Sequence, residues 1–228
     1  MTRRVLGDLV DVMPYRTPQL VDDQIYHVFN RGVARLPIFT DKRDYNRCLE
    51  TIYYYQFQGP KPQFSQLDRF KDFKFEKNKK IVEVLCYCLM QNHYHLLVRQ
   101  LQDNGISEFI SKISNSYTKF FNTKHKRVGP LLQGQFKAVR IESDEQLVHV
   151  SRYIHLNPIA SFLVKDLKEY PWSSYPAYIN LRTDRICTSE FILSMFKTRE
   201  KYEKFVLDQV DYAQSLALVK SLLIDGED

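Results

Sequence analysis

Apolar residues recur along the chain with two different periods, and these periods predict the order of its strands and helices. Short runs rich in apolar, β-branched and aromatic residues, set off by turn or break signals, predict four strands, over residues 25–29, 81–89, 93–98 and 136–141. Spacings of three and four residues predict helices that begin at Thr40, Ser107 and Ser143, where Thr40 and Ser143 have the side chains of helix N-caps. The third helix is expected to end at Asn157, because Pro158 follows it.

The order of these elements, β-α-β-β-α-β-α, predicts an α+β fold. Gln91 and Asn92 form a turn signal between two adjacent strands, which are therefore expected to pair as a hairpin. Helices interleaved among antiparallel strands favour one antiparallel sheet with helices on one face. The opposite face would then be free for ligands.

Three segments differ in character. Residues 1–23 contain prolines and mixed charge and are expected to form an N-terminal arm, ahead of a domain over 24–180. Within that domain, the stretch 58–80 is rich in Pro, Phe and Lys without a clear period, which indicates a long loop or an insertion. Residues 181–228 are expected to form a C-terminal helical extension, because residues 191–223 are helical by pattern.

Composition and charge narrow the class of protein. A hydrophobic fraction of 44% in 228 residues is typical of a globular chain, and a net charge of +6 permits a polyanionic partner without requiring one. The four cysteines include no CxxC pair, and Cys86 and Cys88 alternate within a predicted strand as small buried hydrophobes. No apolar run approaches the length of a membrane span. We therefore expect a protein of the reducing cytoplasm.

Two histidines two residues apart form the first candidate site. His93 and His95 lie in a predicted strand, so their side chains point to the same face and could hold one metal ion. Tyr94 and Leu96 would face the core, which directs both imidazoles away from it. The alternative is that one histidine is a satisfied core residue and the other is exposed.

A tyrosine and an asparagine form the second candidate site. Tyr153 and Asn157 are four residues apart on a predicted helix and share one face. The carboxamide oxygen of Asn157 suits Mg²⁺ or Mn²⁺, and imidazole suits Mn²⁺. The Tyr153 hydroxyl could attack phosphorus if a metal oriented the phosphate, although Tyr153 could also be a packing residue. His149, one turn earlier, is either an accessory group or a surface residue.

Five segments carry a resemblance to a known family. They are Tyr26–Gly32, Met90–Val98, Gln133–Lys137, Arg152–Pro158 and Pro171–Tyr175. Taken in this order, they resemble the HUH single-tyrosine transposases, in particular the REP-associated tyrosine transposases related to the insertion-sequence 200/605 type. The resemblance covers roughly residues 25–178.

The resemblance implies a ferredoxin- or RRM-like catalytic core in which His93 and His95 bind a divalent metal, Tyr153 is the nucleophile and Asn157 is a third ligand. It implies single-stranded DNA with hairpins as the substrate and a 5′-phosphotyrosine intermediate, in transposition or in the processing of REP elements. An enzyme of this kind would be cytoplasmic and associated with the nucleoid. Gln135 stands where relatives commonly have Arg, which puts one DNA contact in doubt.

Candidate DNA contacts and rival functions complete the expectations. A groove that tracks a nucleic-acid backbone needs cations, and the candidates are Arg31, Lys119, Lys137 and Arg140, each of which could also be a plain solvated charge. The rival functions are a single-stranded nucleic-acid-binding module without catalysis and a metal-dependent hydrolytic nuclease. Monomer and homodimer both remain open.

Overall fold

The computed structural model describes residues 19–59, 61–69 and 79–215 of the chain. Most of the arm expected over 1–23, part of the stretch 58–80 and the end of the segment 181–228 therefore lie outside the described residues. Within 58–80, the described part contains one short 3-10 helix, η2 (Phe64–Arg69).

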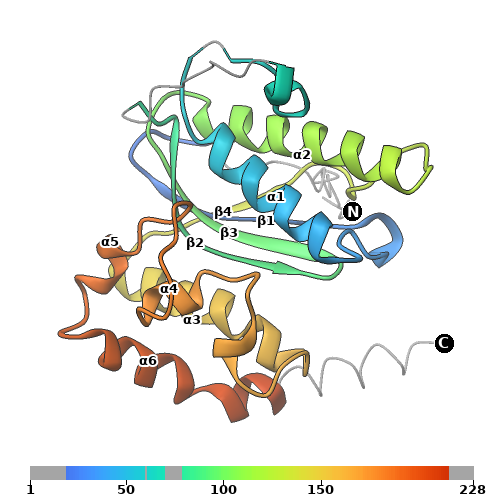
Figure 1. Ribbon diagram of the computed structural model, residues 1–228. Coiled ribbons are helices and arrows are strands. Elements are labelled where there is room, and N and C mark those ends of the chain that lie inside the picture. The colour runs from blue at the N-terminus through green and yellow to red at the C-terminus, as the bar shows by residue number, and fades with distance from the viewer. Residues whose placement is uncertain (1–18, 60, 70–78, 216–228) are drawn as a thin grey trace, which may run out of the picture.

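One four-stranded antiparallel sheet organises the molecule (Figure 1). Its strands are β1 (Ile25–Arg31), β2 (Val82–Met90), β3 (His93–Gln100) and β4 (Lys137–Arg140), in the spatial order β2-β3-β1-β4. Helix α1 (Lys42–Tyr55) connects β1 to β2, and α2 (Gly105–Lys124) connects β3 to β4. This βαββαβ arrangement is the ferredoxin-like one, so the predicted fold class and the β2-β3 hairpin are confirmed.

The first core lies between the sheet and the helices α1 and α2. Tyr26 and Val28 of β1 and Leu96 and Val98 of β3 are buried in it. The helices contribute the buried members of their apolar faces, among them Ile52, Phe109, Ile110 and Ile113. Alternation along the strands therefore fixes which face of the sheet the two helices cover.

The second core lies on the opposite face, which was expected to be free for ligands but is partly covered. Helix α3 (Asp144–Ala160) and the short helices α4 (Tyr175–Tyr178), α5 (Glu190–Leu193) and α6 (Arg199–Leu207) pack there (Figure 1). Their apolar side chains meet those of β2 and β3, such as Leu85 and Leu97. The pattern of strands and helices alone gave no sign that the chain after β4 folds back over the sheet.

The starts of α1 and α2 differ by one or two residues from the predicted ones, whereas the start of α3 is as predicted. Asp41 rather than Thr40 is the N-cap of α1, because its carboxylate accepts from the backbone N–H groups of Arg43 and Asp44. Helix α2 begins at Gly105, two residues before Ser107. Ser143 caps α3 as predicted, since its hydroxyl accepts from the N–H of Gln146.

The predicted end of α3 at Asn157 is wrong. The helix continues through Pro158 to Ala160, and Ser161 then donates its backbone N–H to the carbonyl of Asn157. A proline in a helix removes one hydrogen bond, but here Pro158 is buried with Ile159 against the second core. Tertiary packing therefore outweighs the local preference.

The C-terminal segment and the cysteines complete the picture. The helical pattern over 191–223 is interrupted, because α5 ends at Leu193 and Thr198 caps a separate helix, α6. Cys86 and Cys88 are buried and free, as predicted. Among the helices of the described residues, none is long and apolar enough to cross a bilayer.

Candidate functional site

Strand register gathers the candidate residues on the face of the sheet that α1 and α2 leave uncovered. Strand β1 pairs with β3 so that Arg31 is opposite His93 and Phe29 is opposite His95. Directly opposed residues share a face. Tyr94 is buried in the first core, so His93 and His95 point to the other side, as the alternation predicted.

A third imidazole, His27, joins this pair and was missed at the level of the sequence. Its Nε2 lies 2.9 Å from Nδ1 of His95, and the two rings stack with centroids 5.0 Å apart. His27 stands opposite Leu97 in the register, so its contact with His95 is diagonal. In the sequence, His27 is visible only as a histidine within a predicted strand. Its place beside His95 depends on how β1 pairs with β3, which the sequence does not state.

Helix α3 brings Tyr153 to the same place. The Tyr153 ring stands edge-on to His95 and His27, with centroid distances of 5.5 and 6.0 Å. Its side chain is 51% exposed, whereas His95 is only 6% exposed. The phenol is thus a reachable group above the buried imidazole of His95 and the half-buried imidazole of His27.

Asn157 lies one turn beyond Tyr153 and is 9% exposed. Its Nδ2 donates to the backbone carbonyl of Tyr153 at 2.9 Å. Desolvation lowers the pKa of His93 and raises that of Tyr153, and hydrogen bonds from the Asn157 carboxamide to both side chains partly oppose these shifts. The structure therefore brings together all four residues expected at the catalytic centre: His93, His95, Tyr153 and Asn157.

The hydrogen bonds of the imidazoles decide which nitrogens can bind a cation. Nδ1 of His93 lies 2.6 Å from Oδ1 of Asn92, which can only accept, so Nδ1 carries the proton and Nε2 keeps a lone pair. Nδ1 of His95 is occupied by His27, which leaves Nε2 of His95 for a ligand. For Nε2 of His95 to keep its lone pair, Nδ1 of His95 must donate its proton to Nε2 of His27.

A divalent cation fits this set of donors only if an amide takes part. In the described part of the chain, no three His, Cys, Asp or Glu side chains form a group that could hold a metal ion. Two imidazoles and the Asn157 carboxamide oxygen form a mixed N/O set that suits Mn²⁺, and also Mg²⁺ with water in the remaining positions.

Burial keeps the imidazoles neutral. Desolvation lowers the pKa of His27 to about 4 and lowers the pKa of His93. It also holds the pKa of His95 well below its ordinary value, with a further contribution from the neighbouring His27 and His93. Neutral imidazoles are the form that binds metal, so the site is ready for a cation near pH 7. Desolvation raises the pKa of the Tyr153 phenol, which is therefore protonated at rest.

A buried hydrogen-bond network holds α3 against the sheet. Nδ1 of His155 lies 2.8 Å from the Tyr202 hydroxyl of α6, and Nε2 lies 2.8 Å from Oγ of Ser174. Oγ of Ser174 also accepts from the backbone N–H of Tyr87 in β2 at 2.9 Å. His155 thus ties α3, which carries Tyr153, both to the C-terminal helices and to the sheet.

The four candidate DNA contacts separate into different places. Arg31 and Lys137 are exposed on the face of the histidines, and Arg31 donates through Nε to Gln133 at 2.6 Å. Arg140 pairs with Tyr26 in the register, so it belongs to the opposite face, where it donates to Gln24. Lys119 lies on α2 and lines a hollow between α1 and α2.

His149 is exposed and does not join the catalytic group. Its Nδ1 accepts from Nη2 of Arg152 at 2.7 Å, and its ring lies 5.6 Å from that of Phe205. Arg152 also stacks on Phe205, at 4.2 Å from the ring centroid. His149 therefore packs at the junction of α3 with α6.

Comparison with known proteins gives two similarities. The family model of IS200-like transposases matches residues 67–157, which include β2, β3, α2, β4 and most of α3. A solved structure of a REP-associated tyrosine transposase bound to a REP hairpin is similar with a TM-score of 0.52 and 15% sequence identity, covering 76% of this chain and 90% of the other. No curated protein matches the sequence. At this identity, the structural likeness shows a shared fold.

Proposed function

Because residues 67–157 match the family model of IS200-like transposases, we propose that the chain is an HUH tyrosine transposase that nicks and rejoins single-stranded DNA at hairpin ends. The nucleophile would be Tyr153, and the intermediate would be a 5′-phosphotyrosine. The observation that carries this proposal is the exposed Tyr153 ring 5.5 Å from the ring of His95, in a group completed by His93 and Asn157.

A divalent ion is part of the proposal. His93 and His95 would bind it through their Nε2 atoms, and Asn157 through its carboxamide oxygen. When bound, Mg²⁺ or Mn²⁺ supplies positive charge that stabilises the charge developing on the scissile phosphate. Arg31, opposite His93 in the register, and Lys137 on β4 add fixed positive charge on the same face for the flanking phosphates.

The chemical step conserves the phosphodiester. The Tyr153 oxygen forms a bond to phosphorus as the bond from phosphorus to the 3′ oxygen breaks. The phenol loses its proton, and the leaving 3′ oxygen takes up a proton to become a 3′-hydroxyl. The 5′ side of the cut is then linked to Tyr153. Attack by another 3′-hydroxyl reverses the step and joins the strands. Because the pKa of the Tyr153 phenol is raised by burial, the attack depends on an oriented phosphate rather than on a phenolate already present.

The proposed substrate is DNA with a hairpin. The structurally similar transposase is bound to a REP hairpin, which supports a hairpin substrate for this chain as well. Transposition and the processing of repeated chromosomal hairpins use the same step.

The deciding experiment is denaturing gel electrophoresis of the protein after incubation with labelled hairpin DNA and Mn²⁺. The wild-type protein should acquire a covalent label, and mass spectrometry should place it on Tyr153. Tyr153→Phe removes one oxygen from a half-exposed ring, so hairpin affinity should survive while cleavage and labelling both disappear. Addition of a chelator should abolish cleavage and labelling of the wild-type protein.

The rival functions predict different results in the same experiment. Cleavage by Tyr153→Phe without an adduct would identify a hydrolytic nuclease with water as nucleophile. Binding without cleavage in any metal would identify a binding module. An adduct on another tyrosine would disprove the role of Tyr153 and leave the reaction class in place.

A further inference from the structure

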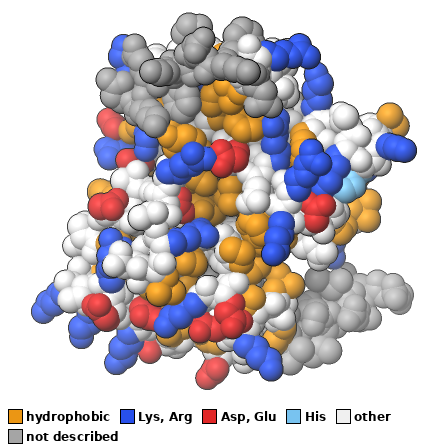
Figure 2. Space-filling model, viewed as in Figure 1, with side chains coloured by type: hydrophobic (Ala, Val, Ile, Leu, Met, Phe, Trp, Pro, Cys, Tyr) orange, Lys and Arg blue, Asp and Glu red, His pale blue; other side chains and the backbone are white. Residues whose placement is uncertain are grey.

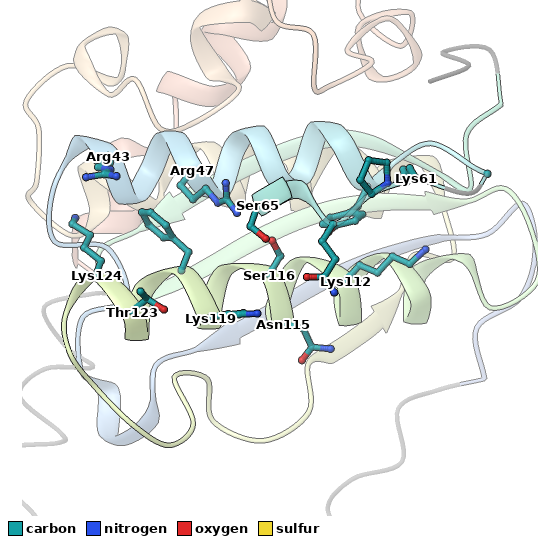
Figure 3. A pocket seen from close by; sticks show the side chains of 15 residues that line it. Arg43, Arg47, Lys61, Ser65, Lys112, Asn115, Ser116, Lys119, Thr123 and Lys124 are labelled. Atoms are coloured by element: carbon teal, nitrogen blue, oxygen red, sulfur yellow. The ribbon is translucent and has the colours of Figure 1, made fainter. Parts of the chain in front are cut away.

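A charged hollow lies on the other side of the sheet from Tyr153, between α1 and α2. Its volume is about 1000 Å³. Figure 3 shows Arg43 and Arg47 entering it from α1 and Lys119 entering from α2, with Lys61 at the end opposite Arg43. We name it the α1–α2 groove and define it by the residues that line it: Arg43, Arg47, Lys61, Lys112, Lys119, Lys124 and nine uncharged residues. Figure 2 shows basic side chains on this face of the molecule, where α1 and α2 lie.

The charge of the groove is strongly one-sided. Of the described residues that line it, six are Lys or Arg and none is acidic. Two of the six are offset by carboxylates, because Lys112 pairs with Glu108 and Lys124 pairs with Asp41 and Asp44. Arg43, Lys61 and Lys119 form no ion pair with any described residue, although the charge of Glu108 acts on Lys61 from a greater distance, so the groove keeps an excess of positive charge.

The surroundings of the Lys61 ammonium indicate an excess of positive charge in the groove. Its Nζ donates to the backbone carbonyls of Tyr54 and Phe57 at 2.8 and 2.5 Å, which hold the ammonium without neutralising it. Desolvation, followed by the nearby charge of Lys112, lowers the pKa of Lys61 to about 8. An anion in the groove would relieve both effects.

The arrangement suits a long anion better than a compact one. Lys112, Ser116, Lys119 and Thr123 follow one another at spacings of three and four residues and therefore form a row along α2. From Lys112 to Thr123 this row spans roughly 16 Å at the rise of an α-helix. A single phosphate would meet only part of the row, whereas successive phosphates of an extended strand could meet all of it.

Aromatic and neutral polar groups favour nucleic acid over an acidic peptide. Phe120 lines the groove, and the guanidinium groups of Arg43 and Arg47 lie 5.9 and 5.3 Å from its ring centroid. Aromatic rings beside cations are a common platform for unstacked bases. Asn115 and Ser116 add neutral hydrogen-bonding groups between the cations.

The groove also has a route toward the catalytic face. Lys119 and Asn115 line a second hollow on the other side of α2, which extends to Asn30 and Gln135. Asn30 immediately precedes Arg31, which stands opposite His93. A strand leaving the α1–α2 groove over Lys119 would therefore pass the end of β1 on its way to the histidines.

We propose that the α1–α2 groove binds the phosphodiester backbone of single-stranded DNA flanking the segment that is cut. This inference rests on the proposed function, because that function makes DNA the ligand, and it adds a second DNA contact outside the cutting centre. Because the cations of α1, α2 and the segment at Lys61 would contact phosphates, which carry no sequence information, the groove should hold DNA of any sequence.

The test is the affinity for unstructured oligodeoxythymidylate of about 20 nucleotides, measured by fluorescence anisotropy over a range of salt concentrations. The Tyr153→Phe background prevents cutting. Arg43→Gln with Lys119→Gln removes two exposed charges and should weaken binding at least about fivefold. It should also reduce the slope of log K against log salt by about 1.4, at about 0.7 per lost phosphate contact on a single strand.

Two controls accompany this measurement. Lys201→Gln with Lys204→Gln makes the same change of net charge on exposed residues of α6 and should leave affinity and slope close to those of the parent. Arg43→Lys with Lys119→Arg keeps the charges and should keep the affinity, which separates charge from folding. Equal losses in the α1 and α2 pair and in the α6 pair would overturn the proposal, as would an unchanged slope.

Competition and adduct formation distinguish the remaining outcomes. A polyglutamate peptide of matched charge should displace the DNA poorly, and displacement as effective as that by unlabelled DNA would assign the groove to acidic proteins instead. If the groove variants lose affinity but the wild type never forms an adduct, the proposed chemistry fails and the groove stands. If adducts form and the groove variants bind like the parent, the groove proposal fails alone.

Discussion

His27 is the residue whose role emerges only from three dimensions. Its Nε2 contacts Nδ1 of His95, and this contact leaves Nε2 of His95 free for the proposed cation. Its exact partner could not be predicted, because a diagonal contact between two strands depends on a register that the sequence does not state. His93 and His95 were predictable together, since they share one strand and one face.

Removing the His27 imidazole should therefore weaken metal binding. We expect His27→Ala to lower the affinity for Mn²⁺ by about 10- to 100-fold, as for other partners of metal-bound histidines. Isothermal titration calorimetry with Mn²⁺ measures this without any turnover. His27→Gln keeps an acceptor and should recover part of the loss, whereas His149→Ala removes an exposed imidazole and should change nothing. Equal Mn²⁺ affinity in His27→Ala and wild type would contradict the role.

Asn157 should act through its oxygen. In Asn157→Ala, the Mn²⁺ concentration that gives half-maximal cleavage should rise, because one ligand is lost. Asn157→Asp should keep much of the activity, since carboxylates bind the same ions. Titration of adduct formation with Mn²⁺ measures both variants. An unchanged Mn²⁺ requirement in the alanine variant would leave Asn157 only its hydrogen bond to the Tyr153 carbonyl.

At the scale of elements, α3 is held by a histidine that must stay neutral. Burial lowers the pKa of His155 to about 3, while the unfolded chain protonates it near its ordinary 6.5. The unfolded state therefore binds more protons between these values, and the contribution of His155 to stability is present above pH 6.5 and is lost as pH falls toward 3.

This linkage gives a measurable slope. Between pH 6.5 and pH 5 the wild type should lose roughly 2 kcal/mol through His155, at about 1.4 kcal/mol per pH unit. His27, His93 and His95 act in the same direction, because burial lowers their pKa values too. Urea unfolding of wild type and His155→Gln over this range isolates the single group: the variant should be less stable at pH 8 and should show a shallower decline. Parallel curves would mean that His155 is charged in the fold.

The elements also show where sequence reasoning reached its limit. Strands β1 to β4 and the caps at Ser143 follow from local chemistry, which a sequence states directly. The continuation of α3 past Pro158 and the α1–α2 groove follow from contacts between distant segments. The proximity of His93, His95, Tyr153 and Asn157 could be expected from two short motifs, whereas the addition of His27 to this group could not.

At the scale of the whole molecule, the proposed cutting site and the proposed DNA-binding groove lie on opposite faces of one sheet. If both faces contact the same strand, affinity should depend on the length of the single-stranded flank. We expect a blunt hairpin to bind weakly to Tyr153→Phe, and a graded series of flanks up to about 16 nucleotides to bind with increasing affinity until both faces are reached. Duplex DNA of the same sequence should bind poorly.

Anisotropy with labelled hairpins at one salt concentration measures this series. The groove variant with Arg43→Gln and Lys119→Gln should lose the gain from long flanks while keeping the affinity for a blunt hairpin. An affinity independent of flank length would show that one face alone contacts the DNA.

The anchoring of α3 has a consequence for the timing of activity during synthesis. The ribosome releases His93 and His95 first and Tyr153 later, but the partners that fix α3, Ser174 and Tyr202, follow later still. A nascent chain that ends before Tyr202 should hold its nucleophile loosely above the imidazoles and leave DNA uncut. If the proposed nicking activity is correct, it should therefore appear only after Tyr202 has been translated.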